Sequence, residues 1–222
     1  MALIIRTFIM SNEVNNFSIA EEIWHAVTHG VGFFLSIAAL VLLVLFAYDN
    51  ENSINMFSAI IYGSALVVMY GSSTLYHAIT NTDLKRLFQK FDHSAIYFLI
   101  AGTYTPIVLV AIGGETGWII FGVEWGIAII GIALKFIYPG RFEALSLIAY
   151  ILMGWLIVVV LDTLRANIDP VGFWLIAAGG ASYTGGVAFY IKDHIRYFHA
   201  VWHLFVIAGS VLQFLAVLLY IV

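Results

Sequence analysis

The sequence has no cysteine and few charged side chains. The absence of cysteine excludes disulfide bonds, thiolate metal ligands and cysteine nucleophiles. Only 10% of the 222 residues are Asp, Glu, Lys or Arg, whereas 63% are hydrophobic. A water-soluble domain of this length needs far more charged surface. The composition therefore predicts an integral membrane protein.

Seven apolar segments approach or reach the length of about 17–25 residues that a helix needs to cross a bilayer. They cover residues 30–47, 54–76, 94–112, 117–136, 142–161, 171–191 and 199–222. They are too long for barrel strands, and open strand edges do not survive in hydrocarbon, so we expect helices. The predicted fold is all-α, a single seven-transmembrane helix bundle at 21–222 after a cytoplasmic tail at 1–20. Pro106 is expected to kink the third helix, and Asp169 with Pro170 to begin the sixth.

The basic residues predict the orientation of this bundle. Eight of the nine Lys and Arg residues lie before the first segment or at the second, fourth and sixth connections between segments. Only Arg165 lies on the other side. Basic residues accumulate on the cytoplasmic side of membrane proteins. We therefore expect a cytoplasmic N-terminus and, after seven crossings, a C-terminus outside.

Histidines from two distant segments reach the predicted cytoplasmic side. His77 ends the second segment, and His199 and His203 begin the seventh. Residues four apart share a helix face, so the last two can direct both rings at one point. Three imidazoles suit a tetrahedral zinc ion that keeps a fourth position for water. We therefore predict that His77, His199 and His203 bind zinc (Zn2+).

Asp92 and Ser73 are the predicted catalytic residues beside this ion. Asp92, before the third segment, can act as a general base or orient a ligand. Ser73, one helical turn before His77, can donate to Asp92, to water or to a developing oxyanion. The alternative is that the histidines only form hydrogen bonds between helices. Ionisable groups at membrane depth are costly and face the bundle interior, and their convergence from several segments favours the metal site.

A second polar group precedes the first segment. Glu21, His25 and His29 lie on one helix face, which is compatible with a second metal site. The alternative, which we favour, is an interfacial amphipathic helix with Glu21 and Glu22 in its first turn and Trp24 at the headgroups. His194 is expected in a solvated loop.

Several functions have little support in the sequence. The last segment has no lysine for a retinal Schiff base, and the spans have no repeated polar stripe to line a pore. Glu124, inside the fourth segment, either serves ion movement or helps packing. The glycines of AAGGASYTGGVAF suggest close packing of the sixth helix, with Tyr183 and Thr184 as hydrogen-bonding partners. No nucleic-acid partner is expected.

The motifs STLYHA, KFDHSAIYFLIAGTYTP and HAVWHLFVIAGS resemble those of the hemolysin III group in the progestin and adipoQ receptor (PAQR) superfamily. The resemblance covers residues 21–222. It implies a zinc site of His77, His199 and His203, with Asp92 contacting the ion through water. By the same motifs, Ser73 matches the serine of the Ser-x-x-x-His pattern.

Two positions depart from the family pattern. His25 stands where similar sequences often have asparagine, and Gln213 stands where histidine is common. Because superfamily members include alkaline ceramidases, the resemblance implies membrane lipids or a lipid-like substrate as partners. We expect a zinc-dependent amide or ester hydrolase for membrane homeostasis, in a bacterial plasma (inner) membrane. The alternatives are a non-catalytic, zinc-clamped receptor or sensor and a pore-forming hemolysin, and the oligomeric state stays open.

Overall fold

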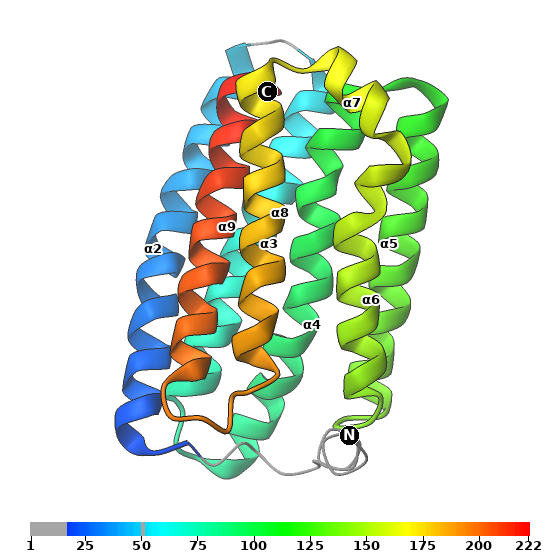
Figure 1. Cartoon of the computed structure of the whole chain (residues 1–222). Coiled ribbons are helices and arrows are strands. Elements are labelled where there is room, and N and C mark those ends of the chain that lie inside the picture. The colour runs from blue at the N-terminus through cyan, green and yellow to red at the C-terminus, as the bar shows by residue number, and fades with distance from the viewer. Residues whose placement is uncertain (1–16, 50–51) are drawn as a thin grey trace.

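The computed structural model describes residues 17–49 and 52–222, and these residues form helices and short connections without strands. Seven long helices lie side by side in one bundle (Figure 1). They are α2 (Ile19–Asp49), α3 (Ser53–Ala78), α4 (Thr82–Pro106), α5 (Gly114–Ile137), α6 (Glu143–Trp155), α8 (Pro170–Tyr190) and α9 (Phe198–Tyr220). Most of the predicted tail, residues 1–16, lies outside the described residues. The beginning of α2 and the end of α9 lie at opposite ends of the bundle (Figure 1).

Within residues 17–49 and 52–222, six helical stretches are long and apolar enough to span a membrane. They are Ile19–Asp49, Ser53–Ala78, Thr82–Ile112, Gly114–Ile137, Glu143–Asn167 and Phe198–Tyr220. Large apolar side chains, including Phe34 and Trp174, are exposed on the outside of the bundle, as contact with hydrocarbon requires. The prediction of a multi-pass helical protein is confirmed. The seventh predicted span is α8, whose glycine, serine, threonine and tyrosine residues make it less apolar, so its crossing stays a prediction, as does the orientation.

Two helices begin earlier than the hydropathy of the sequence indicated. The first helix starts at Ile19 and not at residue 30, and the third starts at Thr82 and not at residue 94. The Asn81 side chain caps α4, because its Oδ1 accepts hydrogen bonds from the backbone N–H groups of Asp83 and Leu84. Hydropathy marks only the apolar part of a helix and therefore misses a polar first turn. As a result, both polar groups of interest lie on regular helices.

The structure also tests the two prolines of the spans. Asp169 caps α8 through a hydrogen bond from the Val171 N–H, and Pro170 occupies the first turn, as predicted. Pro106 is the last residue of α4, and the chain continues as a π-helix over Ile107–Ile112. The connection predicted after α6 is largely helical, because a 3₁₀ turn at Leu156–Val160 leads into α7 (Leu161–Asn167).

Close packing in the bundle core fixes the relative positions of α3, α8 and α9. The Tyr70 hydroxyl of α3 donates to Ser210 Oγ of α9 at 2.7 Å, and Tyr183 Oη of α8 lies 2.8 Å from the same Oγ. A Cβ at Gly186 would collide with Trp202 and Phe205, so the glycine allows α8 to approach α9. The predicted packing role of the α8 glycines is confirmed. This packing aligns the beginning of α9 with the end of α3.

Candidate metal centre

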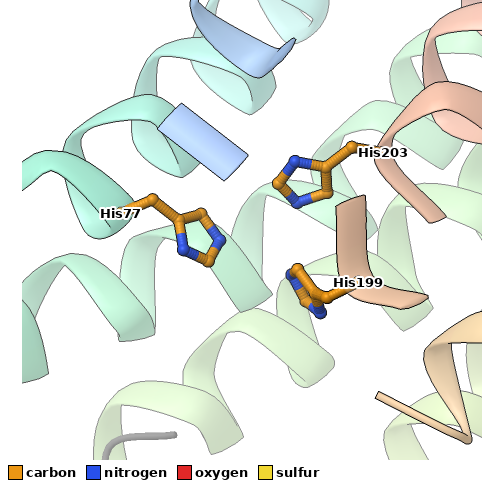
Figure 2. A group of neighbouring side chains, drawn as sticks. All are labelled: His77, His199 and His203. Atoms are coloured by element: carbon orange, nitrogen blue, oxygen red, sulfur yellow. The ribbon is translucent and has the colours of Figure 1, made fainter. Parts of the chain in front are cut away.

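Three histidines meet at the end of the bundle where α3 ends and α9 begins. The rings of His77, His199 and His203 face one another (Figure 2), and one ligand atom of each lies within 4.8 Å of the others. Their ring centroids are 5.2 Å apart for His77 with either partner and 4.7 Å apart for His199 with His203. All three residues are buried. The structure therefore brings together the three residues predicted to bind metal.

A carboxylate fixes the orientation of His77. Glu22 Oε2, from α2, lies 2.7 Å from His77 Nδ1, and Glu22 Oε1 lies 2.8 Å from Lys85 Nζ. Because a carboxylate only accepts hydrogen bonds, Nδ1 carries the hydrogen and donates it to Glu22. Nε2 then keeps the lone pair, and it has no hydrogen-bond partner among the described residues. A carboxylate behind a histidine is the usual way in which a metal ligand is oriented.

A hydroxyl fixes His203 in the same way. His203 Nδ1 lies 3.1 Å from Thr28 Oγ1. The single hydroxyl hydrogen of Thr28 is directed to the backbone carbonyl of Trp24 at 2.8 Å or of His25 at 3.0 Å. Nδ1 of His203 must therefore be the donor to Oγ1, which leaves the lone pair on Nε2. Two rings from two helices thus each keep one nitrogen lone pair for a shared ligand.

The unpartnered nitrogens fit a metal ion. His77 Nε2 and His199 Nδ1 are buried and have no hydrogen-bond partner within residues 17–49 and 52–222. Buried polar atoms without a partner cost free energy, and coordination of a cation removes that cost. Neutral imidazoles suit zinc, although the same donors also bind other divalent transition metals. The chemistry of the donors thus supports a metal-binding group and leaves the metal unspecified.

Ser73, one helical turn before His77 on α3, is paired with Asp92 of α4, and neither residue belongs to the group of close ligand atoms. Both are buried, and the Ser73 hydroxyl is hydrogen-bonded to the Asp92 carboxylate. Asp92 is absent from the sets of described residues whose ligand atoms lie within 4.8 Å of one another. Its Oδ1 has no hydrogen-bond partner among the described residues. This placement is compatible with a group that acts through water, as predicted, and not with a direct ligand.

Comparison with known proteins gives the family. The family model described as "Haemolysin-III related" matches residues 17–214, which include every residue of the metal-binding group. The chain belongs to the haemolysin-III-related family. The predicted resemblance to the hemolysin III group is thereby confirmed.

The relatives match over most of their length. Hemolysin-3 of Bacillus cereus is 41% identical over 203 residues, which cover 91% of this chain and 93% of that protein. The Hemolysin-3 homolog of Bacillus subtilis (strain 168) is 43% identical over 204 residues, or 92% and 96% of the two chains. Human monocyte to macrophage differentiation factor, a PAQR relative, is 29% identical over 203 residues, with 87% and 82% covered.

The positions of the polar residues at the start of α2 agree with neither the interfacial helix nor the metal site of Glu21, His25 and His29. In this haemolysin-III-related protein, His25 and His29 are 0% and 1% exposed, so the favoured interfacial helix is wrong for these two side chains. The Glu21 carboxylate accepts hydrogen bonds from Ser18 and from the Tyr197 N–H, and it is not part of a group of close ligand atoms among the described residues. The second group of close ligand atoms is instead formed by Glu22, His25 and His77.

Three residues near the site were missed by the sequence analysis: Glu22 as an orienting group, Thr28 and Lys85. The adjacent acids at 21 and 22 were a signal, but the choice between them depends on the rotation of α2 against α3.

Glu124, which the sequence placed either in ion movement or in packing, is fully buried, and neither of its carboxylate oxygens has a partner among the described residues.

Proposed function

We propose that this haemolysin-III-related protein is a zinc-dependent hydrolase that cleaves an amide or ester bond of a membrane lipid. His77, His199 and His203 bind the zinc, and Asp92 with Ser73 carries out proton transfer. The main support is the convergence of the three histidines, with a buried carboxylate and hydroxyl beside them. The Bacillus relatives support a bacterial inner membrane as its location.

An apolar cavity near the site is suited to an acyl chain. The cavity has a volume of about 130 Å³ and lies between α4, α6, α8 and α9. Tyr190 and Trp202 form part of its wall, and the ring centroid of Tyr190 lies 6.3 Å from that of His199. A second cavity of about 550 Å³ shares Tyr104 and Gln213 with the first and extends toward Arg165. The two cavities thus share lining residues, and the first has Tyr190, a neighbour of His199, in its wall.

The chain's own residues can assist hydrolysis at this place. Bound zinc lowers the pKa of its water to about 7 and so supplies hydroxide at neutral pH. In this proposal Asp92 accepts a proton from the attacking water and returns it to the leaving amine or alcohol. The Ser73 hydroxyl holds the Asp92 carboxylate in position or donates to the carbonyl oxygen of the substrate as negative charge develops there.

Release of fatty acid tests this function. Zinc-loaded protein in lipid vesicles is expected to release free fatty acid from at least one amide- or ester-linked lipid, measured by mass spectrometry. Asp92→Asn should keep its zinc and lose about 100- to 10,000-fold in rate, which is the usual contribution of a general base. The matched control is Asp83→Asn, an exposed acid on the same helix, which should retain full activity. Equal rates for wild type and Asp92→Asn on every lipid would contradict the hydrolase.

A non-catalytic sensor is the second candidate function. A metal held by His77 and the α9 histidines joins α3 to α9, and the Glu22 contact adds α2. In that case zinc raises the melting temperature and no lipid is cleaved. Lipid occupancy of the apolar cavity would then shift the bundle between two arrangements.

The contact of Glu22 with His77 leads to a prediction about the affinity of the protein for zinc. Glu22→Gln keeps the size of the side chain and removes the charge that orients His77 and pairs with Lys85. Loss of such an orienting group typically weakens metal binding by about 10- to 100-fold. Competition with a zinc chelator on the purified variants measures this change. Glu21→Gln is the matched control, because the hydrogen bonds of Glu21 join it to Ser18 and to the Tyr197 N–H and not to His77. An equal loss in both variants would argue against orientation by Glu22.

A further inference from the structure

A fourth imidazole lies among the three predicted ligands. The ring centroid of His25, on α2, is 4.7 Å from that of His77, 4.8 Å from that of His199 and 5.4 Å from that of His203. The three predicted ligands are separated from one another by 4.7 to 5.2 Å. All six distances among the four rings are therefore similar, which places the centroids near the corners of a regular tetrahedron.

The size of this tetrahedron matches one zinc ion. Four imidazoles that bind zinc at about 2.0–2.1 Å place their ring centroids about 5.2 Å apart in tetrahedral geometry. The six observed separations, 4.7 to 5.4 Å, include this value. Packed rings that bind no ion also take separations of this size, as Phe17 does at 4.7 Å from His25. The spacing therefore permits a shared ion, and the further support comes from the nitrogens of His25.

The two ring nitrogens of His25 form no hydrogen bond with the described residues. The side chain is fully buried, and neither Nδ1 nor Nε2 has a hydrogen-bond partner in the described part of the chain. Nδ1 now faces Glu22 Oε2 at 4.0 Å, beyond hydrogen-bonding distance. A half-turn about the Cβ–Cγ bond keeps the centroid in place and exchanges the two edges of the ring, and this torsion has broad, two-fold preferences. As the ring now stands, His25 is not grouped with His199 and His203 by ligand-atom distance, so its binding to the shared ion requires this half-turn.

His29, the other buried histidine of α2, does not fit the same role. Its ring stacks on that of His203 with centroids 3.5 Å apart and only 10° between the planes. Two parallel stacked rings direct their nitrogens into parallel planes and cannot bind one ion from two corners of a tetrahedron. The geometry thus distinguishes two histidines that are one helical turn apart and equally buried.

We propose that His25 is a fourth protein ligand and that the zinc is held by four imidazoles from α2, α3 and α9. This inference rests on the zinc site of the proposed function and goes beyond it. A site with four protein ligands is typical of structural zinc. Hydrolysis at such a site requires water as a fifth ligand, an expansion that zinc accepts in transition states.

X-ray absorption at the zinc edge of the wild-type protein tests the proposal without any variant. Multiple scattering from imidazole rings is expected to fit four histidines at one zinc per chain. Three histidines with an oxygen ligand would overturn the role of His25. Two zinc ions per chain would also overturn it, because the second would then occupy the group of Glu22, His25 and His77. Failure of the wild type to bind zinc would contradict the proposed function itself.

Variants give a second, independent measurement. His25→Phe keeps a ring in the buried position and removes both nitrogens, so zinc affinity should fall by more than about 10-fold and the fit should lose one imidazole. His29→Phe is the matched control, with the same burial and helix, and should bind zinc as the wild type does. Equal affinities of His25→Phe and wild type would overturn the proposal. Size-exclusion chromatography confirms that both variants are folded before affinity is compared.

Discussion

His203→Ala is expected to leave the purified protein with less than about one tenth of the zinc that the wild type retains. His203 is buried between α2 and α3, and Thr28 fixes its tautomer so that Nε2 keeps the lone pair. Replacement of an orienting partner costs about 10- to 100-fold in metal affinity, and loss of a ligand should exceed that range. Metal analysis by mass spectrometry after gel filtration in zinc-buffered detergent measures the retained amount.

His194→Ala is the matched control for this experiment. His194 lies in the exposed connection between α8 and α9, as the sequence predicted, so its removal should leave the zinc content unchanged. A ligand that binds only the folded state stabilises it by about 4 kcal/mol at 1,000 times its dissociation constant. Chelation should therefore lower the melting temperature of the wild type and have little effect on His203→Ala. Equal zinc contents in His203→Ala and wild type would show that the three rings do not bind the ion.

The three-histidine group could be predicted because it depends on information that is local or topological. The spacing of His199 and His203 places both on one helix face, and the order of the spans places His77 at the same end of the bundle. The structure confirms this convergence. Neither step requires knowledge of how the helices are rotated against each other.

The surroundings of the group could not be predicted, because they do depend on helix rotation. Glu21 and Glu22 are neighbours in sequence and point about 100° apart around α2, since a helix has 3.6 residues per turn. Only the packing of α2 against α3 and α9 decides that Glu22 faces His77. The same packing buries His25, for which the sequence alone favoured a position on an interfacial helix. Hydropathy also hid the first turns of α2 and α4, because polar helical residues carry no apolar signal.

A buried ion pair away from the metal group should be important for stability. Lys135, at the end of α5, is only 3% exposed, and its Nζ lies 2.6 Å from Glu143 Oε2 at the beginning of α6. His93 Nδ1 lies 3.5 Å from the same oxygen. In the sequence, Lys135 stands out only as one of the basic residues that predict the orientation of the bundle. Lys135→Met leaves the Glu143 carboxylate, which is 12% exposed, without its main partner, and loss of one partner of a buried pair typically costs about 3–5 kcal/mol. Thermal unfolding in detergent should show a large fall in melting temperature.

The double variant Lys135→Met/Glu143→Gln distinguishes the loss of the ion pair from the cost of leaving the Glu143 charge without a partner. If the cost of Lys135→Met comes from an unpaired carboxylate, removal of that charge should restore much of the lost stability. Because the two residues are in contact, the stability changes of the two substitutions are not expected to add. Arg86→Met tests an ion pair of the opposite kind, since Arg86 and Asp83 are exposed and 3.8 Å apart, and it should change the melting temperature little. A double variant as unstable as Lys135→Met would mean that the lysine acts through its packing against α4 and α6, and not through its charge.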